Sequence, residues 1–113
     1  MNSAARYLRD PVLADLERKM VLVAGPRQVG KTTLARSLPG GEAGYLNWDV
    51  PEHRERILRR ELPPGQLWIF DEIHRFRRWR DSLKGWYYPR PPDPQILVTG
   101  SRPVELYRQL GNS

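Results

Sequence analysis

The chain has 113 residues, of which 39% are hydrophobic and 28% charged, with a formal net charge of +6 and no cysteine. That length suits one domain with a real core. Disulfides and cysteine-ligated zinc are excluded, and no apolar run is long enough to span a membrane. We expect a cytoplasmic protein whose positive charge favours contact with phosphates without specifying which ones.

The first predicted helix begins at Asp10-Pro11, with Asp10 as its N-cap and Pro11 in the first helical position. Val12, Leu13 and Leu16 give it one apolar side. Two interpretations remain open for this helix. It either packs on the sheet or also lies near a ligand of the motif that follows.

That motif is the strongest in the chain. Residues 25–32 read GPRQVGKT and fit the pattern G-x-x-x-x-G-K-S/T at every fixed position. The apolar run 20–24 before it predicts a buried strand, and residues 33–38 after it predict a helix that ends at Pro39. A strand, a glycine loop and a helix form the context that a phosphate-binding loop requires. The alternative is a glycine-rich turn without a ligand.

The residue types in this loop suit phosphate chemistry. The glycines let successive backbone N–H groups point at phosphate oxygens, and the helix start adds its positive end. Lys31 would meet the outer phosphates, and the Thr32 hydroxyl would bind a magnesium ion. We expect the nucleotide to be bound by Gly25, Pro26, Arg27, Gln28, Val29, Gly30, Lys31, Thr32 and Thr33.

The second predicted strand, residues 45–49, is short and aromatic-rich and ends at Asp49. Ligands gather at the carboxyl ends of parallel strands, so Asp49 could help to hold magnesium or its waters. The alternative is an acid placed near the start of the next helix, which we expect over residues 51–60.

The run Leu67-Trp68-Ile69-Phe70 predicts a fully buried strand that delivers Asp71 and Glu72 at its tip. Two acids are costly to place there unless something nearby needs them. Asp71 would accept the water shell of magnesium, and Glu72 would deprotonate the water that attacks the terminal phosphate. A strand end that simply meets a loop is the alternative.

Residues 73–86 interleave arginines with aromatic side chains. Phe76, Trp79, Leu83 and Trp86 fall at helical spacing, which predicts an apolar stripe in the core with the arginines on a solvated face. Nucleic-acid binding through stacked aromatics is the alternative.

After a proline-rich connector, residues 95–101 predict another buried strand, followed by a short helix over residues 104–110. The hydroxyls of Thr99 and Ser101 could contact the terminal phosphate or the attacking water. The alternative is a strand-to-helix turn with Pro103 at the first helical position.

In this order and spacing, the segments resemble a family of bacterial and archaeal AAA-type ATP-binding proteins, and the resemblance runs from Arg6 to about Leu110. The segments that carry it are GPRQVGKTTL (25–34), YLNWD (45–49), FDEIH (70–74) and TGS (99–101). The resemblance implies an AAA+-like sheet in which the Thr99 strand lies between the phosphate-loop strand and the Asp71 strand. It also implies ATP with Mg²⁺, and the roles already given to Lys31, Thr32, Asp71 and Glu72.

We therefore predict an α/β fold: a three-layer sandwich with a mainly parallel sheet of four strands. Residues 1–113 would form one ATP-binding domain, incomplete at its C-terminal end because family members are longer. Without an outer strand, one edge of the phosphate-loop strand would be uncovered, so we expect marginal stability or self-association. A missing C-terminal domain is the other expected partner.

The function we expect is Mg²⁺-dependent ATP binding with weak hydrolysis, since we find no arginine finger or second sensor. Lys31 and Glu72 are the expected catalytic residues, and Thr32 and Asp71 the metal-binding ones. Two alternatives remain: a small phosphoryl transferase, and a nucleic-acid-binding module with a vestigial loop.

Overall fold

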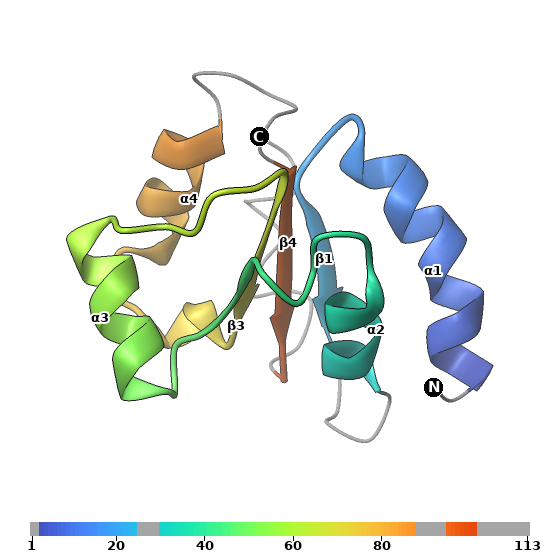
Figure 1. Cartoon of the computed structure of the whole chain (residues 1–113), viewed down its shortest axis with the longest axis horizontal. Helices are drawn as coiled ribbons and strands as arrows, with labels where there is room; N and C mark the ends of the chain where they lie inside the picture. Colours follow the sequence, from blue (N-terminus) through green and yellow to red (C-terminus); the bar gives the residue numbers. More distant parts are fainter. Residues whose placement is uncertain (1–2, 25–29, 88–94, 102–113) are drawn as a thin grey trace.

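The computed structural model describes residues 3–24, 30–87 and 95–101. Its centre is a parallel sheet of four strands in the order β1-β4-β3-β2 (Figure 1). In chain order the elements are α1 (Ser3–Leu16), β1 (Val21–Ala24), α2 (Lys31–Ser37), β2 (Tyr45–Asn47), α3 (Pro51–Arg59), β3 (Leu67–Asp71), the 3₁₀ helix η2 (Ile73–Arg75), α4 (Trp79–Tyr87) and β4 (Gln95–Gly100).

The sheet confirms the predicted fold class and strand order. β4 lies between β1 and β3, so that Leu97 is paired with Val21 on one side and with Ile69 on the other. β2 is paired with β3 at the far edge. The central strands read as continuous apolar runs because both of their faces are covered by helices.

The helices cover the two faces of the sheet as two layers. α1 and α2 lie on one side, and α3, η2 and α4 lie on the other (Figure 1). Successive residues of a strand point to opposite faces. Ile69 and Leu97 therefore belong to the apolar cluster with Leu34 of α2, whereas Phe70 and Val98 belong to the cluster of the α4 side.

The start of the first helix was predicted wrongly. We expected it to begin at Asp10-Pro11, but α1 runs from Ser3 to Leu16 with Pro11 inside it. A proline in a helix removes one backbone hydrogen bond. Ala4, Ala5 and Leu8 are strong helix formers, which favours continuation of the helix back past Pro11 despite that loss.

The region after β3 is also not one helix. It forms the short η2 and then α4, which begins only at Trp79. Phe76 lies between them with extended backbone angles, and its ring stacks on Trp48 with centroids 4.7 Å apart. The expectation that the aromatic stripe belongs to the core is confirmed, because Trp79 and Leu83 are buried and Trp86 packs against the same cluster.

Several predictions lie outside the described residues. These are the loop residues Gly25 to Val29 and the expected helix over residues 104–110.

Candidate functional site

The described part of the phosphate-loop motif forms the start of α2. Gly30 caps this helix with φ 76° and ψ 22°, a left-handed conformation that glycine adopts without strain. Lys31 and Thr32 are the first two residues of the helix, and Thr33 follows. Lys31 is only 4% exposed. Its ammonium and the helix N-terminus both favour negative charge at this point.

Asp71 and Glu72 lie at the carboxyl end of β3, as predicted, and each is only 5% exposed. Asp71 is the last residue of the strand. Glu72 has φ 58° and ψ 26°, and its backbone N–H donates a hydrogen bond of 2.8 Å to the carbonyl of Thr99. This left-handed turn ends the strand and leads the chain into η2.

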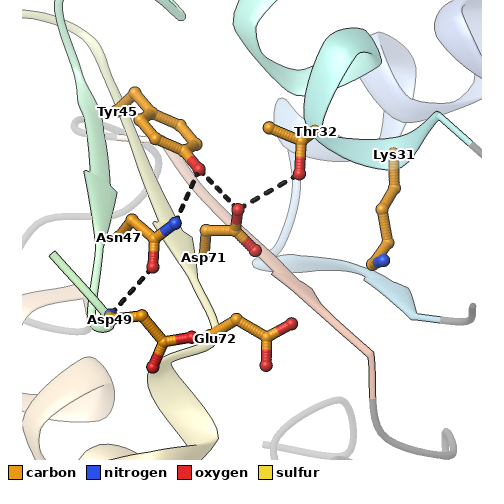
Figure 2. A pocket seen from close by; sticks show the side chains of 7 residues that line it. All are labelled: Lys31, Thr32, Tyr45, Asn47, Asp49, Asp71 and Glu72. Carbon is orange, nitrogen blue, oxygen red and sulfur yellow. Dashed lines mark hydrogen bonds between the residues drawn. The ribbon is translucent and has the colours of Figure 1, made fainter. Parts of the chain in front are cut away.

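The carboxylate of Asp71 joins α2 to β2. Its Oδ2 accepts a hydrogen bond of 3.1 Å from Thr32 Oγ1 and one of 2.5 Å from the phenol of Tyr45 (Figure 2). Tyr45 in turn accepts a hydrogen bond of 3.2 Å from Asn47 Nδ2. Burial, and then the hydrogen bond to Asp71, raise the pKa of Tyr45 above its ordinary value. The phenol therefore keeps its proton at neutral pH and acts as the donor.

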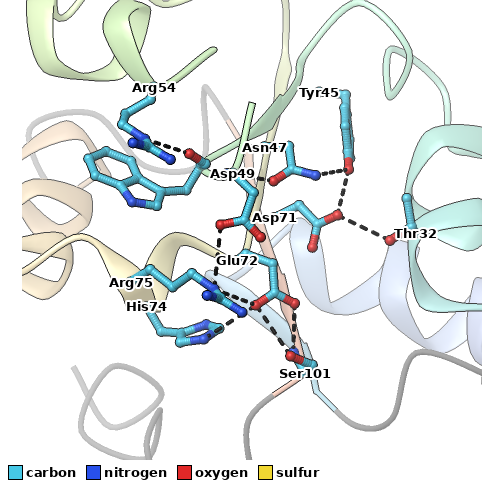
Figure 3. A network of polar contacts seen from close by, with 11 residues as sticks. Thr32, Tyr45, Asn47, Asp49, Arg54, Asp71, Glu72, His74, Arg75 and Ser101 are labelled. Carbon is cyan, nitrogen blue, oxygen red and sulfur yellow. Dashed lines mark hydrogen bonds and ion pairs between the residues drawn. The ribbon is translucent and has the colours of Figure 1, made fainter. Parts of the chain in front are cut away.

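The carboxylate of Glu72 is held from two sides (Figure 3). On one side, Ser101 donates from its backbone N–H to Oε1 at 3.0 Å and from its hydroxyl to Oε2 at 3.3 Å. On the other, His74 Nε2 lies 3.3 Å and Arg75 Nε 3.6 Å from Oε2. Arg75 Nε also lies 3.4 Å from Asp49 Oδ1, which links the ends of β2 and β3.

These side chains surround one pocket with a volume of about 380 Å³. Lys31 and Thr32 enter it from the start of α2, and Asp71 and Glu72 enter it from the end of β3 (Figure 2). The remaining lining residues come from β2 and its end: Tyr45, Asn47 and Asp49. The pocket thus brings together the described residues of the two motifs, which are 39 positions apart at Thr32 and Asp71.

Thr99 is not among the residues that line this pocket. It is opposite Asp71 in the parallel pairing of β3 and β4 and is fully buried. Its hydroxyl has no hydrogen-bond partner among the residues that the structure describes. Buried hydroxyls are normally paired, so this atom offers a polar contact to the side of the sheet that carries Asp71.

Asp49 was left between two interpretations, and both remain open. It lies near the start of α3, directly before the N-cap residue Val50. Asp49 lines the pocket but pairs with Arg75, and its own N–H donates to Asn47 Oδ1 at 2.8 Å.

Sequence reasoning missed the contribution of Tyr45 and Asn47. Both point to the same face of β2 because they are two residues apart, and Asn47 is paired with Asp71 in the sheet. That spacing was visible in the sequence. The pairing of β2 with β3 was not, because it depends on register.

A metal site made by protein side chains alone is absent here: no group of three or more histidine, cysteine, aspartate or glutamate residues occurs at metal-binding geometry in the described ranges. The best candidate ligands for a metal ion are the Thr32 hydroxyl oxygen and the Asp71 carboxylate, which are hydrogen-bonded to each other. Mg²⁺ bound to a nucleotide takes few protein ligands beside phosphates and waters, so this small set of oxygens fits that ion.

A model of the AAA domain family matches residues 17–113, which include all of the sheet and the pocket. The chain belongs to the AAA domain family. Membership agrees with the resemblance inferred from the motifs and indicates a P-loop fold of the nucleotide-binding type. A search of the curated proteins found no match, and a search of the solved structures found none.

Within residues 3–24, 30–87 and 95–101, no helix combines the length and the apolar character needed to cross a bilayer.

Proposed function

We propose that the chain binds ATP together with Mg²⁺ and hydrolyses it slowly. The observation that carries this proposal is the convergence of Lys31 and Thr32 with Asp71 and Glu72 on one pocket. A buried cation at a helix start and two buried carboxylates opposite it supply complementary charges for phosphates and a divalent ion.

The phosphates would be bound at the start of α2. Lys31 would place its ammonium against the outer phosphates, and the backbone N–H groups from Gly30 onward would point at phosphate oxygens. For Gly25, Pro26, Arg27, Gln28 and Val29, and for Thr33, the same role is proposed from the motif alone.

Mg²⁺ would be held by Thr32 Oγ1 and, directly or through water, by Asp71. Their contact of 3.1 Å supports this, because it places the Asp71 carboxylate beside the Thr32 oxygen, within reach of the water shell of an ion bound there. When bound with the nucleotide, the ion supplies positive charge that neutralises the phosphate oxygens.

Glu72 would act as the general base. Each carboxylate oxygen has two lone pairs, and Oε1 accepts the Ser101 N–H, which leaves a second lone pair for a water molecule. The water would give its proton to Oε1 as its oxygen attacks the terminal phosphorus. The bond from that phosphorus to the bridging oxygen would break, and ADP would leave with the oxygen and the electron pair of the bond. Ser101 and the buried Thr99 hydroxyl would contact the phosphate or hold Glu72 in place.

Slow turnover is expected from the charges around the pocket. An arginine at the terminal phosphate accelerates such reactions by about 10³–10⁵-fold. No arginine is among the described residues that line this pocket, and the nearby Arg75 pairs with Asp49 and Glu72.

Calorimetric titration with ATP and Mg²⁺ tests the binding part of the proposal. Lys31→Ala should weaken binding about tenfold or more, because it removes a charge-assisted hydrogen bond. Lys19→Ala removes the same charge from an exposed position and should bind like the wild type. Equal binding by all three chains would contradict a phosphate site at Lys31.

Release of inorganic phosphate tests the catalytic part. Glu72→Gln should reduce release by about 100-fold or more while ATP still binds, because the amide cannot take the proton. Glu61→Gln makes the same change at an exposed residue and is the matched control. Unchanged release by Glu72→Gln would exclude Glu72 as the base.

A further inference from the structure

Two hydroxyl groups donate hydrogen bonds to the candidate metal-binding carboxylate, and the bond from Tyr45 is the shorter one. Its phenol donates to Asp71 Oδ2 at 2.5 Å, and Thr32 Oγ1 donates to the same oxygen at 3.1 Å. These two hydroxyls come from β2 and α2 and meet on the last residue of β3 (Figure 2). Asp71 is therefore held from two elements at once.

The Tyr45 side chain is itself held in place. Asn47 Nδ2 donates to the phenol oxygen at 3.2 Å, so the phenol's own proton is directed to Asp71. Over the face of the ring, the guanidinium of Arg36 lies 5.0 Å from the ring centroid and is ion-paired with Glu42. A half-buried ring fixed at its tip and on its face has little freedom to turn away from the carboxylate.

The two hydrogen bonds to Oδ2 of Asp71 also fix the direction of the other carboxylate oxygen, Oδ1. A carboxylate has about four lone-pair sites on its two oxygens. The Thr32 and Tyr45 hydroxyls both donate hydrogen bonds to Oδ2. Rotation of the Asp71 side chain would break both of them. Oδ1 is thereby kept on the opposite side, away from Tyr45 and Thr32 (Figure 2).

We propose that Tyr45 is a positioning residue that fixes the Asp71 carboxylate so that Oδ1 meets the water shell of the Mg²⁺ that Thr32 Oγ1 would bind in the nucleotide complex. This inference rests on the proposed function, because it concerns the same site. Mg²⁺ demands near-ideal octahedral geometry, so a carboxylate that is free to rotate holds it less well. Groups that orient metal-binding side chains change metal affinity by about 10–100-fold when removed.

Tyr45→Phe is the direct test, because it removes only the hydroxyl and keeps the ring under Arg36. Trp68→Phe is the matched control: it removes an aromatic N–H that donates to the carbonyl of Pro63 at 2.8 Å, and Trp68 does not line the pocket. The purified chains are saturated with ATP and titrated with Mn²⁺, and the free ion is followed by its electron paramagnetic resonance signal. ATP affinity in the presence of a chelator is measured separately with a fluorescent ATP analogue.

We expect Tyr45→Phe to raise the half-saturating Mn²⁺ concentration about tenfold and to change the chelator-treated affinity less than twofold. Trp68→Phe should change neither. The inference is overturned if Tyr45→Phe takes up Mn²⁺ like the wild type, or if it loses nucleotide affinity equally with and without metal, which would mark a purely structural role. If the wild-type chain binds no nucleotide, the proposed function itself is overturned. If the wild type binds nucleotide and Tyr45→Phe takes up Mn²⁺ equally well, only the role of Tyr45 is overturned.

Discussion

Ser101, directly after β4, donates to both carboxylate oxygens of Glu72, from its N–H at 3.0 Å and from its hydroxyl at 3.3 Å. Strands β4 and β3 are neighbours in the sheet. The backbone N–H of Glu72 also donates a hydrogen bond to the carbonyl of Thr99 in β4. The end of β4 therefore determines where the proposed base lies.

Ser101→Ala should lower phosphate release about threefold to tenfold, because it removes one hydrogen bond to a charged group and keeps the backbone one. Affinity for ATP should change less than twofold. Parallel phosphate-release and calorimetric measurements check this, with Ser82→Ala on α4 as the control. A loss of affinity for ATP but not for ADP would instead place the hydroxyl at the terminal phosphate.

Leu97→Ala should destabilise the fold by about 2–5 kcal/mol, the range for large-to-small changes in a core. Leu97 is fully buried on β4 between two strands and beneath α2. Leu58 is 55% exposed, so Leu58→Ala should change stability by less than about 0.5 kcal/mol. Urea denaturation followed by circular dichroism measures both. Similar losses for the two variants would contradict the assigned burial.

Arg60→Gly should stabilise the chain by about 0.5–1 kcal/mol. Arg60 follows α3 with φ 59° and ψ 33°, a left-handed conformation that strains a residue with a side chain. Arg60→Ala keeps that strain and should bring no gain. Thermal denaturation of the three chains distinguishes them, and a loss of stability with glycine would mean that the Arg60 side chain matters more than the backbone.

Gly44→Ala should destabilise by about 2–3 kcal/mol, the cost of overpacking. A Cβ at this position would lie 1.8 Å from the Leu67 carbonyl oxygen, so β2 and β3 would have to move apart. Gly85→Ala in α4 meets nothing within 4 Å and should stabilise by about 0.5–1 kcal/mol. Opposite shifts in melting temperature are the expected result, and a harmless Gly44→Ala would argue against this close approach.

Much of the fold was predictable because its signals are local. The apolar runs of β1, β3 and β4 mark strands covered on both faces, and the proline and glycine segments between them mark breaks. The strand order was predicted from the resemblance of the motifs to those of the AAA-type family. It could not come from the runs themselves, because an apolar run does not specify its neighbour.

The parts that were missed depend on contacts between distant segments. Pro11 predicts a helix start because proline is favoured in the first helical position. The helix-forming residues before it nevertheless extend α1 back to Ser3. Phe76 fits a helical stripe by spacing, yet its ring stacks on Trp48 of another segment and lies outside α4. The bond from Tyr45 to Asp71 likewise requires the register of β2 against β3, which spacing alone does not contain.

Binding at the start of α2 and the end of β3 can be located residue by residue with a two-dimensional amide NMR map of the labelled chain titrated with ATP and Mg²⁺. We expect the largest shifts at Gly30, Lys31, Thr32, Asp71 and Glu72, and we expect Lys31→Ala to reduce them strongly at the same nucleotide concentration. Shifts confined to the arginine-bearing surface of α3 and α4, and unchanged by Lys31→Ala, would contradict this expectation and favour a site for polyanions on that face.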